Sequence, residues 1–376
     1  MLDAGRHPNI NMLAYSEVEG LTGRAGGFTV RVRRRARYVK EDVCNACGDC
    51  VAKCPTKVPD DFDMHLRNRK AVYLYFAQGI PAVMTIDAEH CRFFTKGKCR
   101  VCEKTCQKDA IDFEQQDEVV DLEAGAVVMA TGLDLYDPSV LPQYGYGRLP
   151  NVITGLEYER LINATGPTGG HLLRPSDQKL AEKVAYLQCV GSRDLNHCSY
   201  CSSVCCMYAI KDAMLAREHD PNSKSYIFHT DFRNVGKWFQ NYEHRGAEEY
   251  EIEYIRGRVA EIEEDEDHNP ILWYEDTEKR EVRSLKVDMA VLSTATTPSK
   301  DAGALSKILG IEQNESGFVK ADGKSPVDTT APGIFACGFA LGPKDIPESV
   351  AEASAAASRV AELLGAQGAE KQKTEK

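Results

Sequence analysis

Long apolar runs are missing from this sequence: none of its 376 residues belongs to a stretch that approaches the roughly 18 apolar residues of a membrane-spanning helix. The first residues, MLDAGRHPNI, contain no charged region followed by an apolar core. Positive charge is also in deficit, since 46 Lys and Arg residues face 57 Asp and Glu residues, a formal net charge of −11. We therefore expect a cytoplasmic protein with no membrane span and no general affinity for nucleic acid.

Cysteine, in contrast, is abundant, with 14 residues. In a chain without a secretion signal, this number favours metal ligation in a reducing compartment over a disulfide framework. The run CNACGDCVAKCP contains Cys44, Cys47, Cys50 and Cys54 ahead of Pro55. This C-x2-C-x2-C-x3-C-P spacing is typical of a [4Fe-4S] ferredoxin. Zinc is the alternative, although a tetrahedral zinc site usually takes two of its ligands from a distant segment.

A second and looser run supports the iron–sulfur interpretation. Its cysteines are spaced C-x7-C-x2-C-x3-C, and a glutamine stands where the proline would be expected. In two-cluster ferredoxins the fourth cysteine of each run ligates the other cluster. We therefore assign one cluster to Cys44, Cys47, Cys50 and Cys106, and the other to Cys99, Cys102, Cys54 and Cys91.

A third group contains five cysteines: Cys189, Cys198, Cys201, Cys205 and Cys206. Cys201 and Cys205 are four residues apart, so one face of a helix would present both. Cys189 would arrive from the end of a strand. The group could hold a further cluster or zinc, or its members could be small buried core residues. Cys337, in IFACG, is expected to be a core residue.

The order of predicted elements indicates an α/β protein with an insertion. Strand-like sequence at 28–39 resumes at 118–132, on either side of the cysteine-rich region. From about residue 181 a strand (EKVAYLQCVGSRD), a helix (CCMYAIKDAMLAREH) and a strand (KSYIFHT) alternate, as in parallel βαβ units. Near the end, GIFACG is predicted to be a strand, and the Ala-rich segment after it a helix with Asp345 as N-cap and Pro347 in its first turn.

A basic stretch, RVRRRAR (31–37), is interpreted as the exposed face of a strand. The alternative is a docking surface for an acidic electron-transfer partner.

Several motifs together resemble a known family. VVMATG and PGIFACG…GPKDIPESVAEASAAA resemble flavin-contacting segments of two-dinucleotide-domain, thioredoxin-reductase-like flavoproteins. With QCVGSRD…YCSSVCCMYAIK, GRHPNI and FTKGKCRVCEK, the chain resembles the central and C-terminal part of the heterodisulfide reductase A-subunit family, which are iron–sulfur flavoproteins. The resemblance implies an α/β fold of the two-dinucleotide-domain, thioredoxin-reductase-like type. A ferredoxin module with two [4Fe-4S] clusters would be inserted in it. The implied division is an incomplete FAD-binding-type domain at 1–39, 116–180 and 296–365, the ferredoxin-like module at 40–115, an NAD-domain-like α/β unit at 181–295, and a disordered tail at 366–376.

The resemblance also implies site residues. A third [4Fe-4S] cluster would be held by Cys189, Cys201, Cys205 and Cys206, with Cys198 left over. FAD would be contacted by Thr131, Gly132, Gly338, Lys344, Asp345 and Ile346. Lys211 is a candidate for a catalytic hydrogen bond to the flavin N5 edge, and a solvated helix lysine is the alternative.

One element of the family is missing: the sequence contains no G-x-G-x-x-G turn, which normally receives the FAD pyrophosphate at a helix N-terminus. We therefore expect FAD binding that is weak or depends on a separate chain that supplies this element. The implied activity is oxidoreductase chemistry within a complex, by electron bifurcation or confurcation. The implied partners are other heterodisulfide-reductase-like subunits, hydrogenase or formate dehydrogenase modules, and ferredoxin. The alternative function is a flavin-free cluster relay, or a truncated remnant that acts as a ferredoxin-like binding and electron-transfer module.

Overall fold

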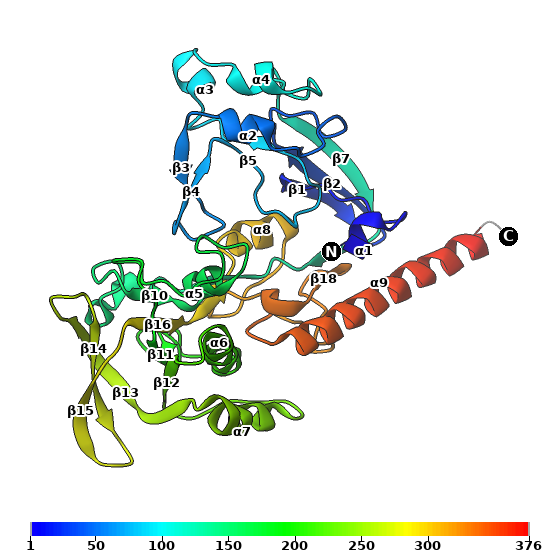
Figure 1. The fold of residues 1–376 in the computed structure, drawn as a ribbon. Coiled ribbons are helices and arrows are strands. Elements are labelled where there is room, and N and C mark those ends of the chain that lie inside the picture. The colour runs from blue at the N-terminus through cyan, green and yellow to red at the C-terminus, as the bar shows by residue number, and fades with distance from the viewer. Residues whose placement is uncertain (1, 375–376) are drawn as a thin grey trace. The chain divides into compact units, whose positions relative to one another are not determined.

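A computed structural model describes residues 2–374 of the chain (Figure 1). Its contacts divide the chain into two compact units, Met1–Ala126 and Val127–Lys376. Within the described residues, no helix has both the length and the apolar character needed to cross a membrane.

In the unit Met1–Ala126, a three-stranded antiparallel sheet has the order β1-β2-β7. Strand β2 alternates, so that Phe28 and Val32 are buried while its arginines face outward. Cross-strand carboxylates neutralise these arginines: Arg31 lies 3.0 Å from Asp121, and Arg34 lies 3.1 Å from Glu118. The arginines of β2 therefore stand beside negative charges on the neighbouring strand, whereas Arg37 lies beyond the strand, is 8% exposed and pairs with Glu41.

The cysteine-rich segment lies between strands β2 and β7, which pair with each other, so it is an insertion in this sheet. It has its own core, in which Val72, Ile86 and Ile111 pack with the cysteines. The elements of this unit are α1 (Leu2–Arg6), β1 (Ser16–Arg24), β2 (Gly27–Arg34), α2 (Asp49–Lys53), β3 (Lys57–Pro59), β4 (Asn68–Lys70), β5 (Val72–Tyr73), β6 (Thr85–Ile86), α3 (Arg92–Lys96), α4 (Val101–Thr105) and β7 (Glu118–Ala124).

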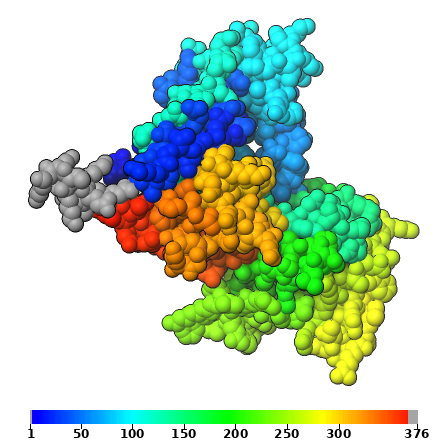
Figure 2. Space-filling model, turned by 180° about the vertical axis from the view of Figure 1, so that it is seen from behind, coloured from blue at the N-terminus to red at the C-terminus, as the bar shows by residue number. Residues whose placement is uncertain are grey.

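The unit Val127–Lys376 is built on a seven-stranded sheet with the order β10-β16-β11-β12-β13-β14-β15. The strands from β10 to β13 run parallel, and β14 and β15 continue antiparallel. Strand β16 is buried at every residue, as expected for a central strand of a parallel sheet covered on both faces. The β14–β15 hairpin, yellow in Figure 2, extends away from the rest of this unit.

Two smaller pieces complete this unit. Strand β8 pairs in parallel with β18, and helix α9 follows. The predicted N-cap of α9 is present, because the Asp345 carboxylate accepts a hydrogen bond from the Glu348 backbone N–H at 2.8 Å. The remaining elements are β8 (Val127–Met129), β9 (Leu133–Leu135), η1 (Pro138–Val140), η2 (Pro142–Tyr144), β10 (Val152–Thr154), α5 (Gly155–Ile162), β11 (Lys183–Val190), α6 (Cys205–His219), β12 (Lys224–His229), α7 (Phe239–Tyr250), β13 (Glu253–Glu264), β14 (Pro270–Asp276), β15 (Glu281–Lys286), β16 (Met289–Thr294), β17 (Thr296–Pro298), α8 (Ala302–Leu309), β18 (Ile334–Ala336), η3 (Gly338–Ala340) and α9 (Ile346–Thr374).

The α/β class is as the sequence predicted, and α6 covers the residues predicted for it. The division into units differs from the predicted domains. Segment 1–39 falls in one unit with 40–115, and β10, from segment 116–180, pairs with β16 of the large sheet. Residues 366–374 have helical backbone in α9, where the sequence predicted a disordered tail, and residues 375 and 376 lie outside the described residues. The finer domain boundaries stay a prediction.

Candidate metal centres and cofactor cavity

Helices α2 and α4 present the first two cysteine groups in the same way. Each helix has five residues and one buried cysteine, Cys50 in α2 and Cys102 in α4. Each ends at a cysteine in extended conformation, Cys54 and Cys106 respectively. Because the chain leaves helical geometry at that residue, its thiol is free to turn away from the cysteine of its own helix.

The cysteines of the first predicted cluster converge. Cys44, Cys47, Cys50 and Cys106 all line one small cavity, so a residue of the second run completes the first group. Burial raises the pKa of Cys50 to about 11, and the neighbouring thiols of Cys106, Cys44 and Cys47 act in the same direction. The backbone N–H of Ala110 points to the Cys106 sulfur at 3.4 Å, the kind of contact that tunes iron–sulfur centres.

The second predicted group likewise combines cysteines of both runs. Burial raises the pKa of Cys102 to about 12, and the nearby thiols of Cys91 and Cys54 act in the same direction. Cys99 stands in the turn before α4 with φ 93. If these thiols ligate a [4Fe-4S] core, its iron would supply the positive charge that holds them as thiolates.

The donor sets, four cysteines each, fit such clusters in chemistry and number. Among the described residues, no group of three or more His, Cys, Asp or Glu side chains is arranged to hold a single metal ion. The individual ligand assignments stay predictions.

The third group gathers around the start of α6. Cys189 lies at the end of β11 with φ 61, while Cys205 and Cys206 open the helix. Burial holds the pKa of Cys205 well above its ordinary value, and the thiols of Cys206, Cys189 and Cys201 act in the same direction. One detail of the sequence reasoning was wrong: Cys201 precedes α6 rather than sharing a helical face with Cys205, because the helix begins only at Cys205.

Donors surround this group. Backbone N–H groups of Ser203 and Arg233 lie 3.4 and 3.5 Å from the sulfurs of Cys201 and Cys206, and an Arg193 nitrogen lies 3.9 Å from that of Cys189. Such donors stabilise thiolates and bear on the reduction potential of a bound cluster.

Cys198 has different surroundings. It is buried beside Tyr200 and Tyr136, where its thiol raises the pKa of both phenols, after burial itself. Cys337 is also buried, in the core next to β18, as the sequence predicted for a packing residue.

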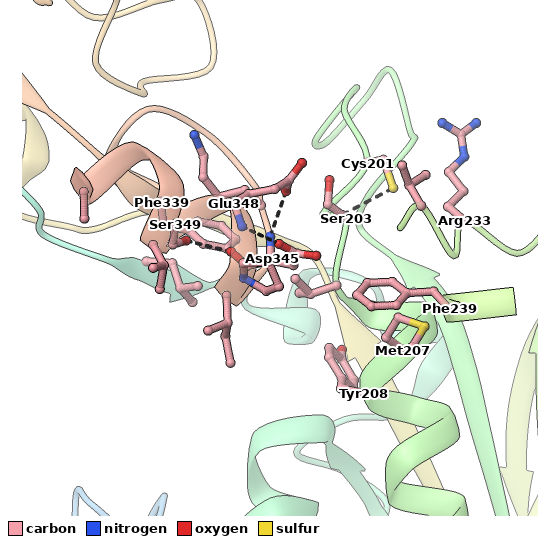
Figure 3. A pocket seen from close by; sticks show the side chains of 18 residues that line it. Cys201, Ser203, Met207, Tyr208, Arg233, Phe239, Phe339, Asp345, Glu348 and Ser349 are labelled. Atoms are coloured by element: carbon pink, nitrogen blue, oxygen red, sulfur yellow. Dashed lines mark hydrogen bonds between the residues drawn. The ribbon is translucent and has the colours of Figure 1, made fainter. Parts of the chain in front are cut away.

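A cavity of about 790 Å3 opens beside the third group. Figure 3 shows Phe339, Asp345, Glu348 and Ser349 on one side of it and Cys201, Ser203, Met207 and Phe239 on the other, with Tyr208 below. The volume and the mainly apolar wall are typical of a small-molecule cofactor site.

The predicted flavin-contacting residues divide into two sets. Lys344, Asp345 and Ile346 line the cavity. Thr131, Gly132 and Gly338 do not line it, although each lies within two residues of a lining residue, Leu133 or Phe339. The backbone N–H of Gly338 instead donates to Glu352 at 2.8 Å, and Lys344 pairs with the same carboxylate.

Lys211 does not line the cavity. It lies one turn beyond Met207 on α6, where its ammonium pairs with Glu159 and lies 2.9 Å from the Asp212 carboxylate. The structure thus gives Lys211 ion pairs within the fold, and its contact with flavin N5 stays a prediction.

Sequence reasoning did not identify several cavity residues, including Met207, Tyr208, Arg233 and Phe239. The last two come from the chain that follows β12 and from the start of α7, and no motif there marks them.

No protein-family model matches the sequence. Among curated proteins, the chain is 44% identical over 366 residues to the iron–sulfur A subunit of CoB–CoM heterodisulfide reductase from Methanocaldococcus jannaschii, covering 96% of this chain and 55% of that protein. It is 47% identical over 370 residues to the iron–sulfur A subunit 2 of CoB–CoM heterodisulfide reductase from Methanopyrus kandleri, covering 97% of this chain and 56% of that protein. It is 42% identical over 364 residues to the A subunit of H2:CoB-CoM heterodisulfide,ferredoxin reductase from Methanothermobacter marburgensis, with 96% and 54% covered.

Among solved structures, thioredoxin reductases were found. The T. acidophilum enzyme has a TM-score of 0.41 at 14% identity and covers 79% of this chain and 85% of that chain. The Lactococcus lactis enzyme has a TM-score of 0.42 at 16% identity, with 78% and 85% covered.

The three cysteine groups and the α/β fold define the class as a cysteine-rich α/β protein. More particularly, the chain is a homologue of the heterodisulfide reductase A subunit, as the sequence motifs predicted, and it spans about half the length of the curated relatives it matches.

Proposed function

We propose that this chain is an electron-transfer component of heterodisulfide reductase type, which passes electrons between a flavin and [4Fe-4S] clusters. The observation that carries the proposal is that Cys201, a member of the third cysteine group, forms part of the wall of the 790 Å3 cavity. A cofactor in this cavity would lie next to a cluster ligand, so electrons could pass without a long intervening gap.

The proposed ligand sets are those assigned from the sequence: Cys44, Cys47, Cys50 and Cys106; Cys99, Cys102, Cys54 and Cys91; Cys189, Cys201, Cys205 and Cys206. Convergence of the thiols, their burial and the N–H donors around them support these sets. The Cys198 thiol, which lies beside two tyrosines, is left out of the third set.

The cavity fits the ring system of FAD. The Phe339 and Phe239 rings and the Met207 side chain offer apolar contact, and the Tyr208 phenol and Ser203 offer polar contact. Helix α9 begins at the wall, so its positive end favours negative charge in the cavity, although the carboxylates of Asp345 and Glu348 offset part of this field. A bound flavin would accept electrons in pairs and release them singly.

The proposed partners follow from the relatives. Their names include H2, formate, ferredoxin and the CoB–CoM heterodisulfide. We propose that this chain works within a comparable complex by electron bifurcation or confurcation, and that tight FAD binding requires a phosphate-binding turn of the G-x-G-x-x-G type, which these 376 residues do not contain.

Anaerobic purification, with iron and acid-extracted flavin measured separately, tests the proposal. We expect about twelve irons per chain, four for each cluster. We also expect substoichiometric FAD that rises when a heterodisulfide-reductase-like partner is co-expressed. Iron with no flavin under either condition would replace the proposal with the flavin-free relay, and stoichiometric zinc without iron would contradict both.

A further inference from the structure

A second cavity in the unit Val127–Lys376 has no part in the function proposed above. Its volume is about 170 Å3, and it lies where β11 and β12 end, with residues of β13 on a further side. These strands are neighbours and parallel, and ligands of open α/β sheets bind outside the carboxyl ends of such strands. The location alone therefore makes this cavity a candidate ligand site.

Two residues that line this cavity, Gln188 and His229, have polar atoms without a hydrogen-bond partner. Both side-chain amide atoms of Gln188 and the Nδ1 atom of His229 are buried and make no hydrogen bond in the described chain. Because these atoms have almost no accessible surface, they do not face the open space of the cavity, and a ligand would have to be held by the other side chains of the lining.

The charge of the wall is one-sided. Arg193 and Arg258 line the cavity, and no Asp or Glu among the described residues does. Their carboxylate partners stand outside the lining: Arg193 pairs with Asp231, and Arg258 lies 3.6 Å from Asp194. A guanidinium has five N–H donors, so one ion pair leaves others available for a ligand.

We propose that this cavity binds a tetrahedral oxyanion, either free phosphate or sulfate, or the phosphate group of a nucleotide. The guanidiniums of Arg193 and Arg258 supply the planar donors that oxyanions favour. The volume corresponds to roughly six water molecules at about 30 Å3 each, which is enough for such a group and for little more. The anion would lie beside Cys189 and, if the proposed third cluster is present, would oppose the addition of electrons there.

Isothermal titration of the whole chain with phosphate, sulfate and AMP tests the proposal. We expect saturable binding that Arg258→Gln weakens at least tenfold, because one charged donor is lost. The matched control is Lys224→Gln, which removes the same charge from an exposed residue at the opposite end of β12, and whose affinity should stay within twofold of the unchanged chain. Tighter binding of AMP than of phosphate would identify a nucleotide as the source of the group, and the reverse would identify the free anion.

Two results would overturn the proposal. One is the absence of saturable binding for all three anions, which would leave water as the occupant. The other is equal weakening by Arg258→Gln and Lys224→Gln, which would mean that net charge alone attracts the anions. Iron content, measured in each variant, separates both from the proposed function: unchanged iron with lost binding concerns this cavity alone.

Discussion

The third cysteine group gives the sharpest test, because the chain contains its own control. Cys205 and Cys198 are 5% and 9% exposed, so replacing either thiol by a hydroxyl buries a polar group in a similar way. We expect each Cys→Ser variant to lose about 1–3 kcal/mol of packing and hydrogen-bonding free energy. Their surroundings differ: Cys205 lies among the thiols of Cys206, Cys189 and Cys201, whereas Cys198 lies beside Tyr200 and Tyr136.

We therefore expect Cys205→Ser to lower the iron content by about four atoms per chain and Cys198→Ser to leave it unchanged. The assay is anaerobic iron and sulfide determination after reconstitution, with electron paramagnetic resonance of the reduced protein to confirm that the ferredoxin-type signals persist. Thermal melts of both variants in the iron-free form check that the substitutions themselves cost similar stability, because a lost cluster would add a destabilisation of its own.

Two outcomes would refute the reasoning. If Cys198→Ser loses the cluster while Cys206→Ser keeps it, the cluster exists but its ligands have been assigned wrongly. If Cys205→Ser, Cys206→Ser and Cys198→Ser all retain full iron, the group consists of core residues.

Three further predictions concern other parts of the chain. Cys50→Ser should remove about four irons and leave the far-ultraviolet circular dichroism of the large sheet unchanged, since Cys50 belongs to the unit Met1–Ala126; simultaneous loss of the sheet signal would contradict this. Lys211→Met should lower the free energy of unfolding in urea by roughly 1–3 kcal/mol, less than for a fully buried pair, because Lys211 is 36% exposed. The FAD content should stay unchanged. A loss of FAD in this variant would instead indicate that Lys211 contacts the flavin. Burial, with the Arg256 charge, lowers the pKa of His229, so the unfolded chain, whose histidines titrate near about 6.5, binds the proton more readily than the folded chain. The free energy of unfolding should therefore fall as pH drops from about 7 to 5, and His229→Phe should flatten that slope in urea melts; an unchanged slope would show that other groups cause it.

The sequence alone determined the features that depend on local spacing. The C-x2-C-x2-C-x3-C run predicted that Cys44, Cys47 and Cys50 lie together, because short loops bring near neighbours together whatever the rest of the fold does. The strand and helix of β11 and α6, and the Asp345 cap of α9, were also predictable, since apolar periodicity and capping act over a few residues.

Tertiary structure decided whatever joins distant segments. No sequence pattern near Lys211 predicts its ion pair with Glu159. Only the packing of α6 against α5 brings the two side chains together and keeps Lys211 out of the cavity lining. Phe239 and Arg233 became cavity residues because the chain between β12 and α7 passes over the start of α6. The cavity proposed to bind an oxyanion likewise joins residues of three strands that are far apart in sequence, so no local motif could predict it. Side-chain spacing along a chain predicts only near neighbours, and a site built from separate strand ends exists only once the sheet has set their order.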